Sequence, residues 1–120
     1  MPKWNVVITD DGYAHYDIER EVLAAVDARV TVKMCETEDD VIALAKSVDA
    51  DGVIVRLQPF TEKVMKALPR VRAVGRYGIG VDNIDWKAAA RYGIAVGNVC
   101  DYAVNEVSEQ AIALMLACAR

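Results

Sequence analysis

Short apolar segments alternate with longer amphipathic segments along most of the chain. The apolar segments are short and rich in β-branched residues, which is typical of buried strands. They cover residues 4–9, 30–35, 52–56, 72–76 and 94–98. Strands that alternate with helices at this spacing predict crossover units and a parallel sheet. Five such strands with helices on both faces predict an α/β domain of flavodoxin-like type, with the strand order 2-1-3-4-5.

The intervening segments have helical periodicity, with apolar residues recurring every three or four positions. In the segment at residues 17–26, one face is expected to carry Ile18, Val22, Ala25 and Val26. In the segment at residues 38–48, the corresponding face carries Val41, Leu44, Ala45 and Val48. Both faces are expected to pack against the sheet.

Polar residues and glycine mark the expected helix ends. Thr37 with Asp40 three positions later resembles a capping box, in which each residue binds the backbone of the other. Thr61 and Asp85 are placed to cap the next two helices. Gly93 stands where a helix ending in the left-handed conformation favours glycine.

The last segment, from Val104 onward, reads as one long helix. Glu106 and Glu109 near its start suit the positive end of a helix dipole. Its second half is apolar nearly all round, so we expect it to be covered by further chain or by a partner subunit. The sequence is therefore interpreted as a piece of a longer protein.

Composition narrows the classes of function. The net charge is −4, which argues against nucleic acid as a partner. Three widely spaced cysteines and one histidine, His15, make a metal site or a disulfide framework improbable and suggest a reduced, cytoplasmic protein. The longest apolar run, residues 111–119, is too short to cross a bilayer, so no membrane association is expected.

The sequence VGRYGIGVDNID, at residues 74–85, carries three closely spaced glycines: Gly75, Gly78 and Gly80. A dinucleotide-binding fingerprint has the spacing Gly-x-Gly-x-x-Gly, follows a first strand and opens directly into a helix. Here the spacing differs, the segment follows the fourth strand, and the next helix begins only near Trp86. We therefore do not expect a pyrophosphate loop.

Two explanations for the glycines remain open. They permit a tight turn with positive φ, which needs no ligand. Alternatively, the successive N–H groups of such a turn form a concave anion site at the carboxyl end of a strand, where open α/β sheets bind ligands. Arg56 and Arg76, at the ends of the third and fourth strands, are candidates to bind a carboxylate there.

The segment VGRYGIGVDNIDWKAAARYGIAVGNVCDYAVNEVSEQ resembles the D-isomer-specific 2-hydroxyacid dehydrogenases. The resemblance is strong over residues 50–120 and rests on the strand pattern alone over residues 4–50. It implies a two-domain, NAD- or NADP-dependent enzyme, expected to be a homodimer, that exchanges hydride with a D-2-hydroxy or 2-oxo acid. Residues 1–100 would form the substrate-binding domain. Residues 101–120 would form a helix leading to a Rossmann domain outside this sequence.

The resemblance also assigns roles to individual residues. The turn Tyr77, Gly78, Ile79 and Gly80 would offer backbone N–H groups to the substrate carboxylate. Arg56 and Arg76 fall where phosphoglycerate dehydrogenases also place arginine, so both would contact an anionic substrate.

The cofactor side of the site is assigned in the same way. Ile79 would lie close to the nicotinamide, and Ala103 and Val104 would line the cofactor cleft. The catalytic arginine, glutamate and histidine of the family belong to the other domain. His15 does not match that histidine and is expected at the surface.

One position departs from the family pattern: Cys100 stands where many relatives have proline. We interpret it as a small apolar filler.

Three other functions remain as alternatives: a corepressor-like protein-binding scaffold of the same fold, a free-standing binding domain, and a receiver-type signalling domain. Asp10 and Asp11 resemble the acidic pair of the receiver-type domain. That domain is disfavoured because Arg56 occupies the place of its phospho-accepting aspartate.

Overall fold

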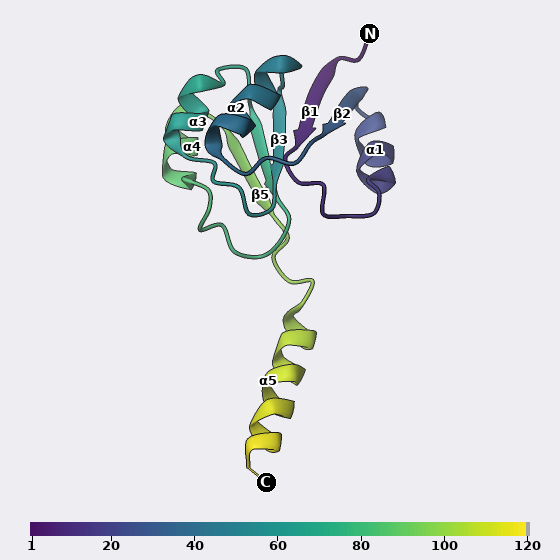
Figure 1. Cartoon of the computed structure of the whole chain (residues 1–120), viewed down its shortest axis with the longest axis vertical. Coiled ribbons are helices and arrows are strands. Elements are labelled where there is room, and N and C mark those ends of the chain that lie inside the picture. Colours follow the sequence, from purple (N-terminus) through teal and green to yellow (C-terminus); the bar gives the residue numbers. More distant parts are fainter. Residues whose placement is uncertain (120) are drawn as a thin grey trace.

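The computed structural model describes residues 1–119 and contains one five-stranded sheet (Figure 1). All strand pairs are parallel, and the order β2-β1-β3-β4-β5 confirms the predicted fold. The strands are β1 (Trp4–Ile8), β2 (Ala28–Val32), β3 (Gly52–Val55), β4 (Ala73–Arg76) and β5 (Ala95–Asn98).

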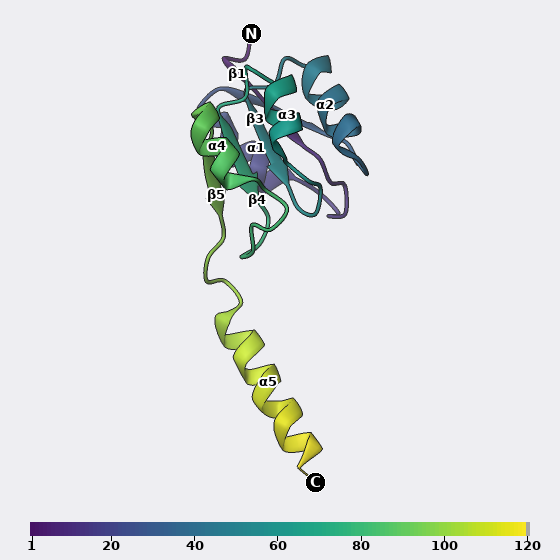
Figure 2. The same cartoon turned by 90° about the vertical axis from the view of Figure 1, so that its left-hand side faces the viewer.

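Three helices cover one face of the sheet and a fourth lies on the other side (Figures 1 and 2). The covering helices are α2 (Glu38–Ser47), α3 (Glu62–Ala67) and α4 (Trp86–Tyr92). Helix α1 (Asp17–Ala24) lies beside β2, and α5 (Val104–Cys118) projects away from the sheet.

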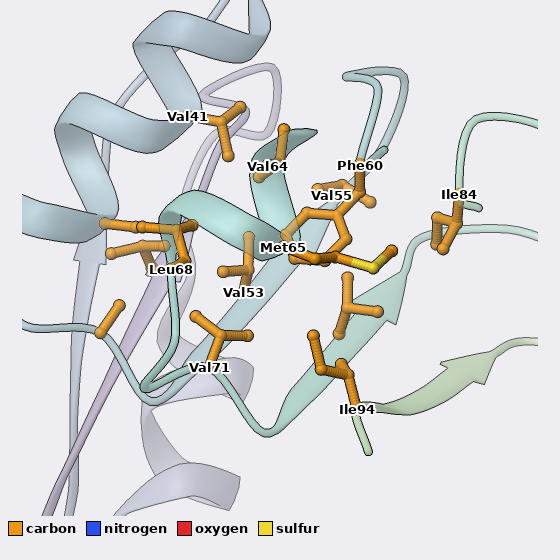
Figure 3. Packing of buried hydrophobic residues seen from close by; sticks show 14 of the residues in the cluster. Val41, Val53, Val55, Phe60, Val64, Met65, Leu68, Val71, Ile84 and Ile94 are labelled. Carbon is orange, nitrogen blue, oxygen red and sulfur yellow. The ribbon is translucent and has the colours of Figure 1, made fainter. Parts of the chain in front are cut away.

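The hydrophobic core lies between the sheet and the three covering helices (Figure 3). Val7, Val53 and Val74 are aligned across the three central strands and are all at most 2% exposed. Phe60 and Met65 lie next to each other in the same cluster (Figure 3) and are equally buried. Each such side chain contributes about 1.5–3 kcal/mol by leaving water. This core therefore holds the strand ends that carry the candidate site.

Helix α1 differs from the prediction. Its expected apolar face is exposed, with Ile18 at 69%, Val22 at 66% and Val26 at 54%. The helix lies near an edge strand, and Leu23 is the apolar α1 residue that lines a groove with Trp4. Helical periodicity identifies which residues share a face, but the described residues place nothing over that face.

Strand β2 begins two residues earlier than the hydrophobicity pattern predicts, and it also ends earlier. Its first residues, Ala28 and Arg29, pair with Trp4 and Asn5 of β1. An edge strand tolerates an exposed arginine. The start of β2 therefore does not show up as an apolar run in the sequence. The predicted residues beyond Val32 continue alongside the end of β1 through single backbone hydrogen bonds. The other four strands lie within one residue of their predicted bounds.

Most of the predicted helix ends are confirmed. Thr37 and Asp40 form a complete capping box, Asp85 accepts from the N–H of Ala88 at 2.8 Å, and Gly93 ends α4 with φ +67°. The prediction that the Thr61 side chain caps its helix is wrong. Thr61 occupies the N-cap position of α3, but its hydroxyl donates to the Glu38 carboxylate instead of accepting from its own helix.

Helix α5 is a single helix, as predicted, and none of its described residues is buried. Large apolar side chains are exposed along it: Val104, Val107, Ile112, Leu114, Met115 and Leu116. Its covering by another part of the protein stays a prediction. None of the helices formed by residues 1–119 combines the length and the apolar character needed to cross a bilayer.

Candidate ligand site at the carboxyl ends of the strands

The candidate site lies where β1, β3 and β4, three neighbouring strands, end at the same edge of the sheet. Asp10 follows β1, Arg56 follows β3, and the turn at residues 77–80 follows β4. Parallel pairing brings these segments together, because Val55 and Arg76 are aligned as partners. The location is the ligand-binding end of an open α/β sheet.

The backbone of the turn offers a row of donors. Within residues 1–119, the N–H groups of Gly78, Ile79 and Gly80 have no hydrogen-bond acceptor. The N–H of Tyr77 donates to the carbonyl of Val55 at 2.9 Å, so it is already occupied. The expected donor set of four is thereby reduced to three. Successive free N–H groups of this kind form an anion-binding concavity.

The carbonyl groups of the turn are held from the β5 side. The amide of Asn98 donates to the carbonyl of Ile79 at 2.6 Å, and the N–H of Val99 donates to the carbonyl of Gly78 at 3.1 Å. These two bonds fix the orientation of the peptide groups that carry the free donors. Sequence reasoning missed Asn98 as a positioning residue; one sequence signal for it is its place at the end of the last strand.

Gly78 requires glycine for two independent reasons. Its φ is +127°, a conformation that side chains rarely allow. In addition, a Cβ at this position would lie 1.8 Å from Nη1 of Arg76. Gly80 has neither constraint, because a Cβ there would meet only the Asp82 carboxylate, at 3.5 Å.

Arg76 lies partly buried against the turn. Its Nε is buried, and within residues 1–119 it has no hydrogen-bond partner. An unpaired buried donor on a charged group costs free energy, so the site favours an acceptor. Arg76 is therefore suited to an anion that also contacts the turn.

Arg56 is held by an ion pair on the neighbouring strand. Its Nε lies 2.8 Å from Oδ2 of Asp10, and the Asp10 side chain is 2% exposed, against 34% for Arg56. The guanidinium also lies over the Tyr13 ring, with Cζ 5.8 Å from the ring centroid. The sequence pattern relates Asp10 only to the receiver-type alternative and does not reveal its partner.

Tyr77 connects the turn to α1. Its hydroxyl donates to the Glu19 carboxylate at 2.7 Å, and its ring meets that of Tyr13 edge-on. Burial, together with the Glu19 charge, raises the pKa of Tyr77 well above its usual range, so the hydroxyl stays protonated at neutral pH. Tyr77 also lines an open pocket of about 370 Å³ with His15 and Ile18.

A buried network of polar side chains connects the segments that follow the strands at the site. The hydroxyl of Thr9 bonds to Oε1 of Gln58 at 3.0 Å, and Nε2 of Gln58 donates to the carbonyl of Cys35. The amide of Asn83 donates to the carbonyl of Gln58 at 2.8 Å, which links the loop after β3 to the segment after the glycine turn. The sequence pattern does not predict the pairing of Thr9 with Gln58.

Two of the three proposed cofactor contacts lie at exposed positions, Ile79 in the glycine turn and Val104 at the start of α5. Ile79 is 42% exposed and Val104 is 55% exposed, while Ala103 is partly buried at the N-cap. The glycine turn does not lead into a helix, because α4 starts only at Trp86. The glycine turn therefore lacks the helix N-terminus that a dinucleotide pyrophosphate loop uses.

Two further predictions concern single residues. His15 lies at the surface, as expected, 3.7 Å from the Asp17 carboxylate. The interpretation of Cys100 as an apolar filler is wrong, because Cys100 is exposed and its thiol lies 3.4 Å from Oδ1 of Asn98. No group of three potential metal ligands occurs within residues 1–119.

The fold and the site together define an α/β domain that presents a glycine turn and two arginines at its ligand-binding end. Residues 6–113 match the family described as D-isomer specific 2-hydroxyacid dehydrogenase, catalytic domain. The chain belongs to this family, which argues against the receiver-type alternative.

Known relatives agree with this assignment. The chain is 32% identical over 104 residues to D-3-phosphoglycerate dehydrogenase of Mycobacterium leprae, covering 86% of this chain and 20% of the relative. It is 40% identical over 78 residues to glyoxylate reductase of Pyrococcus furiosus. That match covers 64% of this chain and 23% of the relative. The chain thus spans about a fifth of the length of these relatives.

A solved structure extends the comparison to three dimensions. The 3-phosphoglycerate dehydrogenase of Entamoeba histolytica, solved with NAD+ bound, superposes with a TM-score of 0.73 at 29% identity. The match covers 93% of this chain and 38% of that one.

Proposed function

We propose that the full-length protein is an oxidoreductase that transfers hydride between NAD(H), or its phosphorylated form, and a D-2-hydroxy or 2-oxo acid. In this proposal the described domain binds the acid. Family membership supports the reaction class, and the relatives named above act on acids of this type by name.

The observation that carries the proposal is the row of free N–H groups at Gly78, Ile79 and Gly80. A carboxylate would accept these donors from a backbone that the bonds from Asn98 and Val99 already hold. Hydrogen bonds to a charged group contribute about 1.5–3 kcal/mol each. The donors would hold the acid in one orientation, which is the main contribution of a substrate-positioning domain.

The two arginines would complete the anion site. Arg76 offers a buried Nε beside the turn, and Arg56 is fixed by Asp10 at the next strand end. A single guanidinium can bind a carboxylate through two hydrogen bonds. The second guanidinium therefore favours an acid with a second negative group, such as a phosphate. Several relatives are named as D-3-phosphoglycerate dehydrogenases, in line with this preference.

The cofactor would bind mainly outside this domain. When bound, the nicotinamide supplies or accepts the hydride. Ile79 would contact it from the turn, and Ala103 and Val104 would line the cleft edge. The catalytic arginine, glutamate and histidine are expected in the other domain, so this chain positions the acid and excludes water from its side of the cleft.

The same proposal accounts for α5. Residues 1–100 would form the acid-binding domain, and residues 101–120 would lead to the cofactor domain. The apolar side chains exposed on α5 would be covered by that domain and by a second subunit, as in a homodimer. Three free cysteines agree with a reduced, cytoplasmic location.

The test is NADH oxidation by the full-length protein with a panel of 2-oxo acids: glyoxylate, pyruvate and 3-phosphohydroxypyruvate. Turnover of at least one acid is expected, with the phosphorylated acid preferred. The 120-residue chain alone is expected to be inactive. Turnover by that chain alone would contradict the assignment of the catalytic groups to another domain. Failure of the full-length protein with every acid would contradict the reaction class.

A further inference from the structure

A buried carboxylate lies directly behind the site. The side chain of Asp10 is 2% exposed, and both its oxygens are occupied. Oδ2 lies 2.8 Å from Nε of Arg56, and Oδ1 accepts from the N–H of Gly12 at 2.7 Å. Burial of a charge is unfavourable unless it is paired and hydrogen-bonded. The position of Asp10 is therefore closely coupled to that of Arg56.

The ion pair involves only the Nε of the Arg56 guanidinium. Within residues 1–119, the Nη1 and Nη2 groups of Arg56 have no hydrogen-bond acceptor. Because the guanidinium is planar, a fixed Nε–H also fixes the direction of the two terminal nitrogens. The Tyr13 ring, 5.8 Å from Cζ, further limits rotation of the plane. Arg56 is thus presented with its terminal donors free.

Gly12 supports the same arrangement. A Cβ at this position would lie 2.7 Å from Oδ1 of Asp10 and 3.1 Å from Nη2 of Arg56. Both distances are too short for ordinary contact, so only glycine leaves the ion pair undisturbed. The loop after β1 is therefore shaped around Asp10 and Arg56.

We propose that Asp10 is a positioning residue that holds the guanidinium of Arg56 at the end of β3, with its terminal nitrogens left free for an acid bound at the neighbouring strand end. The inference rests on the proposed function, because it takes the acid as the ligand of the turn. Asp10 itself does not touch the acid, and it acts only through Arg56.

The first test compares Asp10→Asn with Asp11→Asn in the full-length protein. Asp11 is the exposed neighbour, and its replacement changes the net charge equally. Asp10→Asn is expected to raise the KM for the preferred 2-oxo acid about tenfold, in proportion to one weakened charged hydrogen bond. The dissociation constant of NADH is expected to stay within about twofold. Asp11→Asn is expected to leave both values unchanged.

A double-mutant cycle separates positioning from a structural role. In an Arg56→Gln background, Asp10→Asn is expected to raise the KM by less than about twofold, because the group that it positions is gone. A tenfold rise in both backgrounds would overturn the inference. If Asp10→Asn does not fold, Gly12→Ala takes its place in the same cycle, since its Cβ would crowd both Asp10 and Arg56 and disturb their pairing while keeping both charges.

A spectroscopic measurement separates this inference from the proposed function. The Nε–H signal of Arg56 in the ¹⁵N NMR spectrum of the full-length protein is expected to shift when pyruvate is added, and to lose this response in Asp10→Asn. A shift without turnover of any acid would contradict the dehydrogenase but support the positioning role. Turnover with an unchanged KM in Asp10→Asn would support the dehydrogenase and overturn the positioning role. No shift and no turnover would overturn both.

Discussion

The guanidinium of Arg76 lies against the backbone of Gly78, in the space that a side chain would otherwise occupy. A Cβ at Gly78 would be 1.8 Å from Nη1 and 2.9 Å from Cζ of Arg76. The last residue of β4 thus packs onto the turn that it leads into. Through this contact, the positive charge of Arg76 lies next to the first of the three free N–H groups.

Gly78→Ala in the full-length protein is expected to disrupt acid binding. The residue would be strained at φ +127°, at a cost of about 1–3 kcal/mol, and Arg76 would be displaced. We expect the KM for the acid to rise at least tenfold, with the NADH dissociation constant nearly unchanged, in steady-state kinetics and fluorescence titration. Proline is less informative at this position because its ring cannot adopt a positive φ.

Gly80→Ala is the matched control for that variant. A Cβ at Gly80 meets only the Asp82 carboxylate, at 3.5 Å, and its φ is not positive. The KM is expected to change less than about threefold. An equal rise of the KM in the two variants would show that any substitution in the turn weakens acid binding. It would contradict a specific role for the contact between Arg76 and Gly78.

Asn98→Ala tests how the turn is held. The substitution removes the 2.6 Å hydrogen bond to the carbonyl of Ile79. We expect faster hydrogen exchange at the N–H of Val99, which donates to Gly78, and a several-fold rise in the KM for the acid. Asn105→Ala, on the exposed start of α5, is the control. Unchanged exchange at Val99 in Asn98→Ala would contradict the positioning role.

Phe60→Ala tests the core beneath the strand ends. Phe60 is fully buried, so its truncation is expected to lower the free energy of unfolding by about 3–5 kcal/mol. Leu57→Ala, at a side chain 67% exposed, is expected to change it by less than about 0.5 kcal/mol. Urea unfolding followed by circular dichroism measures both. Similar losses in the two variants would be inconsistent with the described core.

Asp40→Asn tests the capping box through pH. Hydrogen bonds from the side chain and backbone of Thr37 lower the pKa of Asp40 in the folded protein. A lowered pKa means that the stabilisation is present at neutral pH and is lost as the pH falls through the folded value. Asp40→Asn is therefore expected to lower the melting temperature at pH 7.

This loss is expected to shrink steadily below about pH 4, where Asp40 begins to be protonated in the unfolded protein while the folded protein still holds it charged. Glu21→Gln, at an exposed position on α1, is the control and is expected to show no such dependence. A melting-temperature difference that is constant from pH 7 to pH 3 would contradict the charged capping box.

The sequence was sufficient to predict the fold because each local signal agreed with the others. Strand periodicity, the Thr37 capping box, the Asp85 cap and Gly93 all indicate the same order of elements. Exposure of α1 could not be predicted in the same way. Periodicity shows that Ile18 and Val22 share a face, but not whether anything covers that face.

The site was predicted only in outline. Sequence reasoning proposes the turn and both arginines as candidates, but it does not reveal the pairing of Asp10 with Arg56, which joins positions 46 residues apart. It also could not show that the N–H of Tyr77 is used by Val55, because that bond depends on the register between β3 and β4. Such contacts follow from the three-dimensional alignment of strand ends.

In the proposed function, the glycine turn and its arginines bind the carboxylate of the substrate. The most direct measurement compares kcat/KM of the full-length protein for its preferred 2-oxo acid and for the methyl ester at C1 of the same acid, with NADH. Loss of the negative charge is expected to lower kcat/KM at least tenfold in the wild-type protein. The difference is expected to shrink to about threefold or less in Gly78→Ala. Equal kcat/KM values for acid and ester in the wild-type protein would contradict the account.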